Sequence, residues 1–157
     1  MSEQEQKIVP VHTRLVPSSP ASIDKVRQLT EVVKELPQTP FVTEHLLHAG
    51  MYTRTVRFPA DTVLTAVLIK VGTVFVICGS ADIYSNDELI PVEGFTILPG
   101  SAGRKVAIVT HSEVAISMIL TTDAKTIEEA EKAFTDEYQL LVPLSEADKH
   151  HILITGE

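Results

Sequence analysis

The sequence predicts an antiparallel β-sandwich or barrel with flanking helices, and three observations support this fold class. Residues 51–121 contain roughly seven or eight short segments rich in β-branched residues, separated by turn signals at the spacing of a sandwich or barrel. No helical pattern lies between successive strands, so a parallel sheet is not expected. Helical patterns instead precede and follow the strand region.

Residues 1–20 are expected to form an extended arm. Pro10, Pro17 and Pro20 disfavour both a helix and a central strand in this segment. Its aliphatic residues make it more apolar than a typical disordered tail. We expect the arm to lie along another surface, such as a neighbouring subunit.

Residues 21–37 have the pattern of an amphipathic helix. Aliphatic residues recur at three- and four-residue spacing, namely Ile23, Val26, Leu29, Val33 and Leu36. We expect Ser22 to cap the start of the helix, and Pro37 lies just beyond its end. The helix is expected to dock on the chain's own barrel, although docking on a partner stays open.

Residues 38–125 are expected to form the barrel. Its first part should contain a proline-rich turn and one helical turn that ends at Gly50. From Met51 the pattern alternates, which predicts a strand whose Tyr52, Arg54 and Val56 share one face. The last segment, residues 126–157, is expected to hold a helix and a tail strand, "HILIT". Thr126 and Glu129 have the spacing of a capping box at the start of that helix.

Composition excludes several classes of protein. The 157 residues suggest one domain, and the formal net charge of −8 without a basic cluster argues against binding to nucleic acid or to an anionic membrane. No apolar stretch approaches the roughly 20 residues that span a bilayer, and residues 1–6 lack the apolar run of a signal peptide. Cys78 is the single cysteine and is expected to be a buried thiol, which fits a protein made in a reducing cytoplasm.

The strand region resembles the cupin family of small β-barrels. The resemblance covers roughly residues 50–120 and rests on Gly79, Gly94 and the segment "LPGSAGRK", with Pro99 and Gly100. Cupins carry His-x-His and then a Glu in a first sequence motif, and one further His in a second motif. Aligned on Gly79 and Pro99, these positions hold residues of other kinds, namely Ala66, Leu68, Gly72 and Arg104.

These substitutions predict a barrel without a metal. A transition-metal site needs several His or carboxylate ligands that converge on one point. Apolar side chains offer no lone pair, and the guanidinium of Arg104 repels a cation. We therefore expect no cofactor. His45 and His48 would share one face of a helix and could supply two ligands of a zinc site, but no third ligand is evident.

The whole chain also resembles small cupin-like proteins encoded in tailed bacteriophage and prophage genomes. The resemblance rests on "HAGMYTRTVRFPADTVLTAVLIK", "LPGSAGRKVAI" and "TDAKTIEEAEKAFTDE". It implies a virion component made in the host cytoplasm, since jelly-roll barrels recur in capsid decoration and tail parts. It is an association through the fold, and fold alone does not imply function.

Three cations form the remaining candidate site. If Arg54 and Arg104 point into the barrel, they could bind a carboxylate or phosphate together with Lys105. Pairing of these residues with carboxylates of the barrel rim is the alternative.

We therefore expect a non-enzymatic, homo-oligomeric structural protein that contacts other phage structural proteins, as capsid decoration or as a tail or head–tail part. A cupin enzyme and a module that binds a small anionic ligand stay open, each with a cytoplasmic location.

Overall fold

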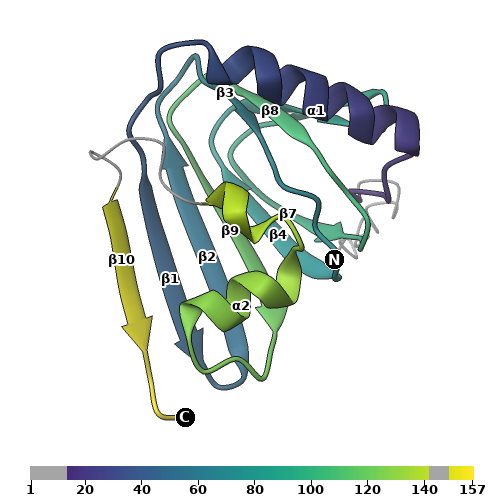
Figure 1. Ribbon diagram of the computed structural model, residues 1–157. Coiled ribbons are helices and arrows are strands. Elements are labelled where there is room, and N and C mark those ends of the chain that lie inside the picture. Colours follow the sequence, from purple (N-terminus) through teal and green to yellow (C-terminus); the bar gives the residue numbers. More distant parts are fainter. Residues whose placement is uncertain (1–13, 142–148) are drawn as a thin grey trace, which may run out of the picture.

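The computed structural model describes residues 14–141 and 149–157. Expectations for most of the N-terminal arm, and for the segment around Pro143, lie outside the described residues. Two β-sheets, two α-helices and a short 3-10 helix (Tyr138–Leu141) make up the described chain (Figure 1). The prediction of a β-rich, largely antiparallel architecture with flanking helices is confirmed.

The larger sheet has six strands, and all but one of its pairings are antiparallel. The exception is the edge strand formed by the C-terminal segment, which pairs in parallel with its neighbour. The strands follow the order β10 (Lys149–Ile154), β1 (Val42–His48), β2 (Met51–Phe58), β9 (Val114–Thr121), β4 (Thr73–Cys78) and β7 (Phe95–Gly100).

The smaller sheet has four strands and faces part of the larger one. Its strands follow the order β3 (Val63–Thr65), β8 (Ala107–Thr110), β5 (Ala81–Ser85) and β6 (Glu88–Val92). Asn86 and Asp87 join β5 to β6 with φ values of 51° and 64°. Both residue types tolerate this left-handed conformation, so the sequence fits the tight turn that it predicts.

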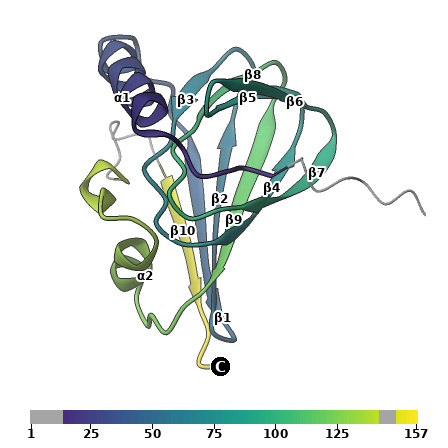
Figure 2. The same cartoon turned by 90° about the vertical axis from the view of Figure 1, so that its right-hand side faces the viewer.

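Strand alternation divides the core into two halves. On β9 the inward side chains of Val114, Ile116, Met118 and Leu120 are all buried. Val114 and Ile116 pack in the cluster between the two sheets, whereas Met118 and Leu120 pack against α2 (Ile127–Phe134). Figure 2 shows the four-stranded sheet and α2 against the same face of the six-stranded sheet. The helix thus closes the part of the barrel that the smaller sheet leaves open.

The first helix begins earlier than the sequence pattern suggests. α1 (Pro20–Lys34) is capped by Ser19, whose hydroxyl accepts the amide of Ser22 at 3.1 Å. The expectation that Ser22 is the cap was therefore wrong, because proline is favoured at the first helical position and the cap precedes it. The helix lies beside β3, and Thr30 donates to the Thr65 hydroxyl at 2.9 Å. No helix in the described ranges is long and apolar enough to cross a membrane.

The described end of the N-terminal arm belongs to the chain's own fold. Leu15 is fully buried in the cluster between the sheets. Its amide donates to the carbonyl of Pro99 at 2.9 Å, and its carbonyl accepts the amide of Ser101 at 2.8 Å. Residues 14–19 therefore extend along β7 on the way to α1.

A strand replaces the helical turn expected before Gly50. Residues 42–48 form β1, because pairing with β2 on one side and β10 on the other provides the hydrogen bonds that a helix would supply locally. Side chains three residues apart then point to opposite faces. His45 and His48 consequently do not share a face, which corrects the basis of the expected two-histidine pair.

Candidate functional site

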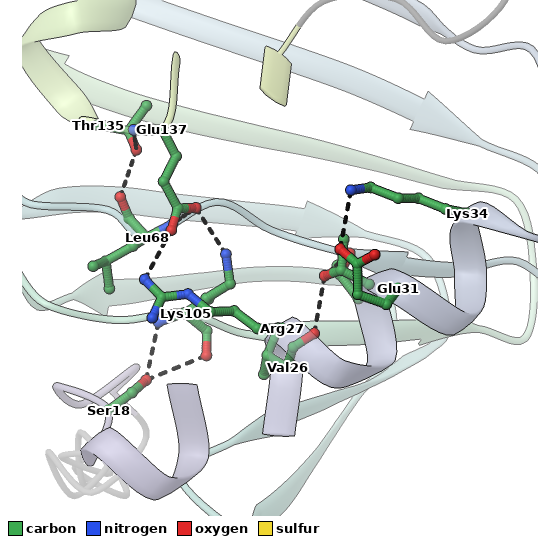
Figure 3. Close-up of polar contacts among 11 residues, drawn as sticks. Ser18, Val26, Arg27, Glu31, Lys34, Leu68, Lys105, Thr135 and Glu137 are labelled. Atoms are coloured by element: carbon green, nitrogen blue, oxygen red, sulfur yellow. Dashed lines mark hydrogen bonds and ion pairs between the residues drawn. The ribbon is translucent and has the colours of Figure 1, made fainter. Parts of the chain in front are cut away.

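The three cations expected to form an anion site are held by groups of the chain itself. Lys105 precedes β8 and is only 3% exposed. Its ammonium Nζ lies 2.8 Å from Oε2 of Glu137, a residue that follows α2 (Figure 3). Its backbone amide donates to Ser18 Oγ at 2.9 Å, and the same hydroxyl donates to the Lys105 carbonyl at 3.2 Å. Both ends of Lys105 are thus fixed.

Glu137 is the centre of this cluster. Besides Lys105, it receives Arg27 of α1 at 3.2 Å and the backbone amide of Leu68 at 3.0 Å (Figure 3). Thr135 adds a further link, since its hydroxyl donates to the Leu68 carbonyl at 2.6 Å and accepts the Glu137 amide at 3.1 Å. The cluster joins α1, the loop between β3 and β4, the start of β8 and the segment after α2.

The charge of Glu137 is stabilised by its donors. Burial alone would raise the pKa of this carboxyl, but the hydrogen bonds from Lys105 and Leu68, with a smaller one from Arg27, lower the pKa below its usual value of 4.5. With its pKa lowered, this mostly buried carboxyl, whose side chain is 18% exposed, is ionised and paired with Lys105 near neutral pH. The arrangement holds two cations on one carboxylate, which suits a structural clamp.

Arg104 occupies a different environment. It is 2% exposed, and its guanidinium donates to Thr73 Oγ1 at 2.6 Å and to the Ser101 carbonyl at 3.0 Å. Within residues 14–141 and 149–157, no carboxylate forms an ion pair with it. Burial lowers the pKa of Arg104 to about 10, so the side chain remains a cation at neutral pH.

Gly100 makes room for this guanidinium. A β-carbon at Gly100 would lie 2.7 Å from Cζ of Arg104 and 2.8 Å from Thr73 Oγ1. The glycine of the "LPG" segment therefore serves the packing of Arg104, in addition to ending β7.

Arg54 lies on the inner face of β2 and reaches α2. Its guanidinium is 3.3 Å from Glu131, and both side chains are mostly buried. Its neighbour on the same face, Tyr52, is fully buried, and the hydroxyl lies 2.7 Å from Nδ1 of His45. Burial raises the pKa of the Tyr52 hydroxyl, an effect that Arg54 partly offsets.

The three cations therefore have separate partners and no common focus. Arg54 pairs with a residue of α2, and Lys105 pairs with a residue of the segment after α2. Arg104 donates to residues of β4 and of the loop after β7. Sequence reasoning missed the two carboxylates involved, Glu131 and Glu137. Both are distant in the chain from the cations they bind, and no local pattern marks them among the many acidic residues.

The positions that carry metal ligands in cupins do not fit a metal here. Ala66 packs against the core between the sheets, and the backbone of Leu68 binds Glu137 and Thr135. Gly72 has no side chain, and Arg104 is cationic. Across the described residues, no three His, Cys, Asp or Glu side chains are grouped so that they could hold a metal ion.

The two histidines singled out from the sequence serve separate regions. His45 is buried against Tyr52. His48 lies at the other face, where Nδ1 is 2.8 Å from the hydroxyl of Thr155 and Nε2 is 3.8 Å from Glu157. His48 borders an open hollow of about 240 Å³ between the β1–β2 turn, the segment after β9 and the C-terminal residues. This hollow lies away from the space between the sheets.

Comparison with known proteins finds no related sequence and only a low similarity to solved cupin structures. The sequence matches no protein-family model and no curated protein. A cupin superfamily protein from Desulfitobacterium hafniense is 17% identical, with a TM-score of 0.47, over 57% of this chain and 84% of that one. A cupin-2 domain protein from Shewanella frigidimarina is 13% identical, with a TM-score of 0.40, over 59% and 91%.

A third similar structure is the cupin-2 domain of an XRE family transcriptional regulator from Enterobacter cloacae. It is 7% identical, with a TM-score of 0.44, over 55% of this chain and all of that domain. The described chain has a β-rich fold with two sheets and two flanking α-helices, as the strand and helix patterns of the sequence predicted. At these identities the similarity carries nothing about activity.

Proposed function

We propose that this protein is a non-enzymatic structural component of a bacteriophage virion, and that it acts through contacts with other proteins. The observation that carries the proposal is an exposed apolar run on the edge strand β10. Ile152, Leu153 and Ile154 are 57%, 59% and 49% exposed. Among the described residues, nothing covers these consecutive aliphatic side chains on the two faces of the strand.

An exposed apolar edge strand is unfavourable in an isolated protein. Its free backbone groups and side chains invite pairing with another chain, and proteins usually protect such edges with charges, proline or a covering element. Neither the smaller sheet nor α2 covers β10 (Figure 1). A partner that pairs with or covers this strand would remove the apolar side chains from water, at a gain of about 25 cal/mol per Å².

The interior of the barrel also favours a scaffold role over catalysis. The inward faces of both sheets pack in two apolar clusters, and the buried cations bind groups of the same chain. The buried cations Arg54, Arg104 and Lys105 therefore hold elements of the chain together. Such an interior suits a protein that must keep its shape while other proteins bind to its surface.

The assignment to a phage particle rests on the sequence resemblance given above. In this proposal the protein is made in the host cytoplasm, assembles as a homo-oligomer and contacts other virion proteins as capsid decoration or as a tail or head–tail part. It needs no cofactor, nucleic acid or membrane for this role.

One observation favours a second candidate, a module that binds a small anion. Arg104 is a buried cation paired with neutral oxygen atoms, and a ligand carboxylate or phosphate could pair with it more strongly. Calorimetric titration with inorganic phosphate and with a dicarboxylate tests this candidate. Binding that is lost in Arg104→Met supports it, whereas the absence of binding to the wild-type protein excludes these two ligands.

Mass spectrometry of purified particles tests the virion role. Particles are induced from a host that carries the gene, purified by density, and quantified for this protein relative to the major capsid protein. We expect a fixed stoichiometry that survives a high-salt wash. A variant with Ile152→Lys and Leu153→Lys should be lost from particles, whereas Leu140→Lys, which changes a similarly exposed residue outside β10, should be retained. Absence of the wild-type protein from washed particles would refute the proposal.

A further inference from the structure

The outer face of the six-stranded sheet is a second apolar surface, distinct from the edge strand β10. We define this outer apolar face by the outward side chains of three adjacent strands. They are Val74, Val76 and Cys78 of β4, Phe95, Ile97 and Pro99 of β7, and Ala115, Ser117 and Ile119 of β9.

Large side chains on two of its strands, β4 and the edge strand β7, are strongly exposed. Phe95 is 71% exposed, Ile97 is 57% exposed and Val74 is 44% exposed. Cys78, expected from the sequence to be a buried thiol, is also exposed on this face, directly opposite Phe95 in the strand register. That expectation was wrong because side chains alternate along β4, so that Ile77 points into the core and Cys78 points outward. Contiguous exposed apolar surface of this kind marks an interaction site.

The face carries almost no charge. The neighbouring strands β2 and β1 continue it outward, and over the five strands from β7 to β1 the charged outward residues are Arg57 and Glu44. These two pair with each other at 3.3 Å. A face with no net charge stands out on a chain whose formal net charge is −8.

We propose that this outer apolar face binds the same face of a second copy of the chain, so that two sheets pack face to face in a two-fold dimer. The inference deepens the proposed assembly role by naming its first contact. Two acidic chains repel each other, and contact through a surface without net charge keeps that repulsion smallest. An uncharged face also offers no counter-charge to a strongly charged partner, and under two-fold symmetry it meets itself without bringing like charges together.

The outer apolar face together with its continuation over β2 and β1 is large enough for a dimer. These five strands, about 4.8 Å apart and about six residues long, at about 3.4 Å per residue, cover about 500 Å² on each copy. Two copies would bury about 1,000 Å² before the relief of the side chains is counted, which is about the minimum expected of a biological interface. Stacked sheets in sandwiches pack about 10 Å apart, and branched and aromatic side chains such as Ile97 and Phe95 fill that space.

Sedimentation equilibrium of the full chain over a range of concentrations tests the proposal. We expect a dimer for the wild-type protein and a monomer for Phe95→Lys combined with Ile97→Lys, with Kd raised by about 100-fold or more, because a dimer would bury unpaired ammonium groups. Leu89→Lys is the matched control, since Leu89 is 48% exposed on the smaller sheet, and it should remain dimeric. Both variants should keep the wild-type circular dichroism spectrum and melting temperature.

Cys78 provides an independent readout at the face. Its alkylation by a maleimide should slow by about tenfold in the dimer compared with the double-lysine variant, and the protection should vanish on dilution as the dimer dissociates. A wild-type monomer at about 100 μM, or a dimer unaffected by the lysines, would overturn the proposal.

The chain's own first residues are the alternative occupant. If Cys78 is protected in a monomer and becomes reactive when residues 1–13 are deleted, that segment covers the face and the dimer proposal is wrong. The test is separate from that of the virion role, because a dimer missing from particles refutes only that role. A monomer found in particles refutes only the dimer.

Discussion

Gly100 and Arg104 are fitted to each other. The guanidinium carbon of Arg104 lies only 2.7 Å from the point where the β-carbon of a side chain at position 100 would be, which is too close for two carbon atoms that are not bonded. A cation that the sequence offers as a ligand-binding group is thus held against the backbone at the end of β7, with Thr73 and Ser101 as its acceptors.

Gly100→Ala should lower the free energy of unfolding by about 1–3 kcal/mol, because the added methyl group overpacks a buried site. Gly72→Ala is the matched control, since its β-carbon would meet only the Gly100 carbonyl at 3.9 Å. Urea denaturation measures both. In an Arg104→Ala background the cost of Gly100→Ala should fall by at least half. Equal costs in both backgrounds would show that Arg104 is not the obstacle.

Glu137→Gln should destabilise the fold by about 2–4 kcal/mol, because it leaves the buried ammonium of Lys105 without its anion. Arg27→Ala removes the exposed partner of the same carboxylate, at a side-chain exposure of 54%, and should cost less than about 1 kcal/mol. Chemical denaturation of both variants and of Glu137→Gln combined with Lys105→Met checks this. The double variant should recover part of the loss, and no recovery would contradict the buried-pair explanation.

The contribution of Glu137 should depend on pH. Its pKa is lower in the folded chain than the usual 4.5, so the folded state favours the carboxylate. The resulting stabilisation is fully present above about pH 4.5 and is lost as the pH falls through the lower folded pKa. The difference in unfolding free energy between wild type and Glu137→Gln should therefore be constant from pH 7 to 5 and shrink below 4.5. A difference that grows on acidification would reverse the assigned direction.

The strand pattern could be predicted where one face is buried. Tyr52, Arg54 and Val56 share the inner face of β2 as their alternation indicates, and Thr126 accepts the amide of Glu129 at 3.2 Å at the start of α2, as the capping spacing predicts. Both signals are local, since they depend on neighbours within a few residues.

The other features of the fold and of the candidate site depend on contacts between residues that are distant in sequence. Residues 42–48 form a strand because β2 and β10 pair with it, and the three-residue spacing of its histidines carries no information about that pairing. The pairing of Lys105 with Glu137 and of Arg54 with Glu131 likewise requires α2 to dock on the sheet. The type of the candidate site residues could be predicted, but their partners could not.

Addition of a chelator or of Zn²⁺ should leave the melting temperature unchanged. His45 is buried beside Tyr52, and His48 points to the opposite face, so the two cannot bind one ion. Differential scanning calorimetry with EDTA and with equimolar Zn²⁺ measures this. A rise of several degrees with Zn²⁺ that is lost in His48→Ala would show a site involving His48, and about one metal per chain after desalting would contradict the prediction directly.

Two N-terminal truncations should behave differently. Removal of residues 1–13 leaves Leu15 and Ser19 in place and serves as the reference for the longer truncation. Removal of residues 1–19 deletes a fully buried leucine, the hydrogen bonds of Leu15 to β7 and the following loop, and the cap of α1. We expect that loss to be about 3–5 kcal/mol, from the leucine at about 2–4 and the cap at about 1. Urea denaturation of both truncated chains measures the difference, and Leu15→Ala in the full chain separates the leucine from the cap. If the longer truncation is as stable as the shorter one, the contacts of residues 14–19 with β7 and α1 contribute nothing to the fold.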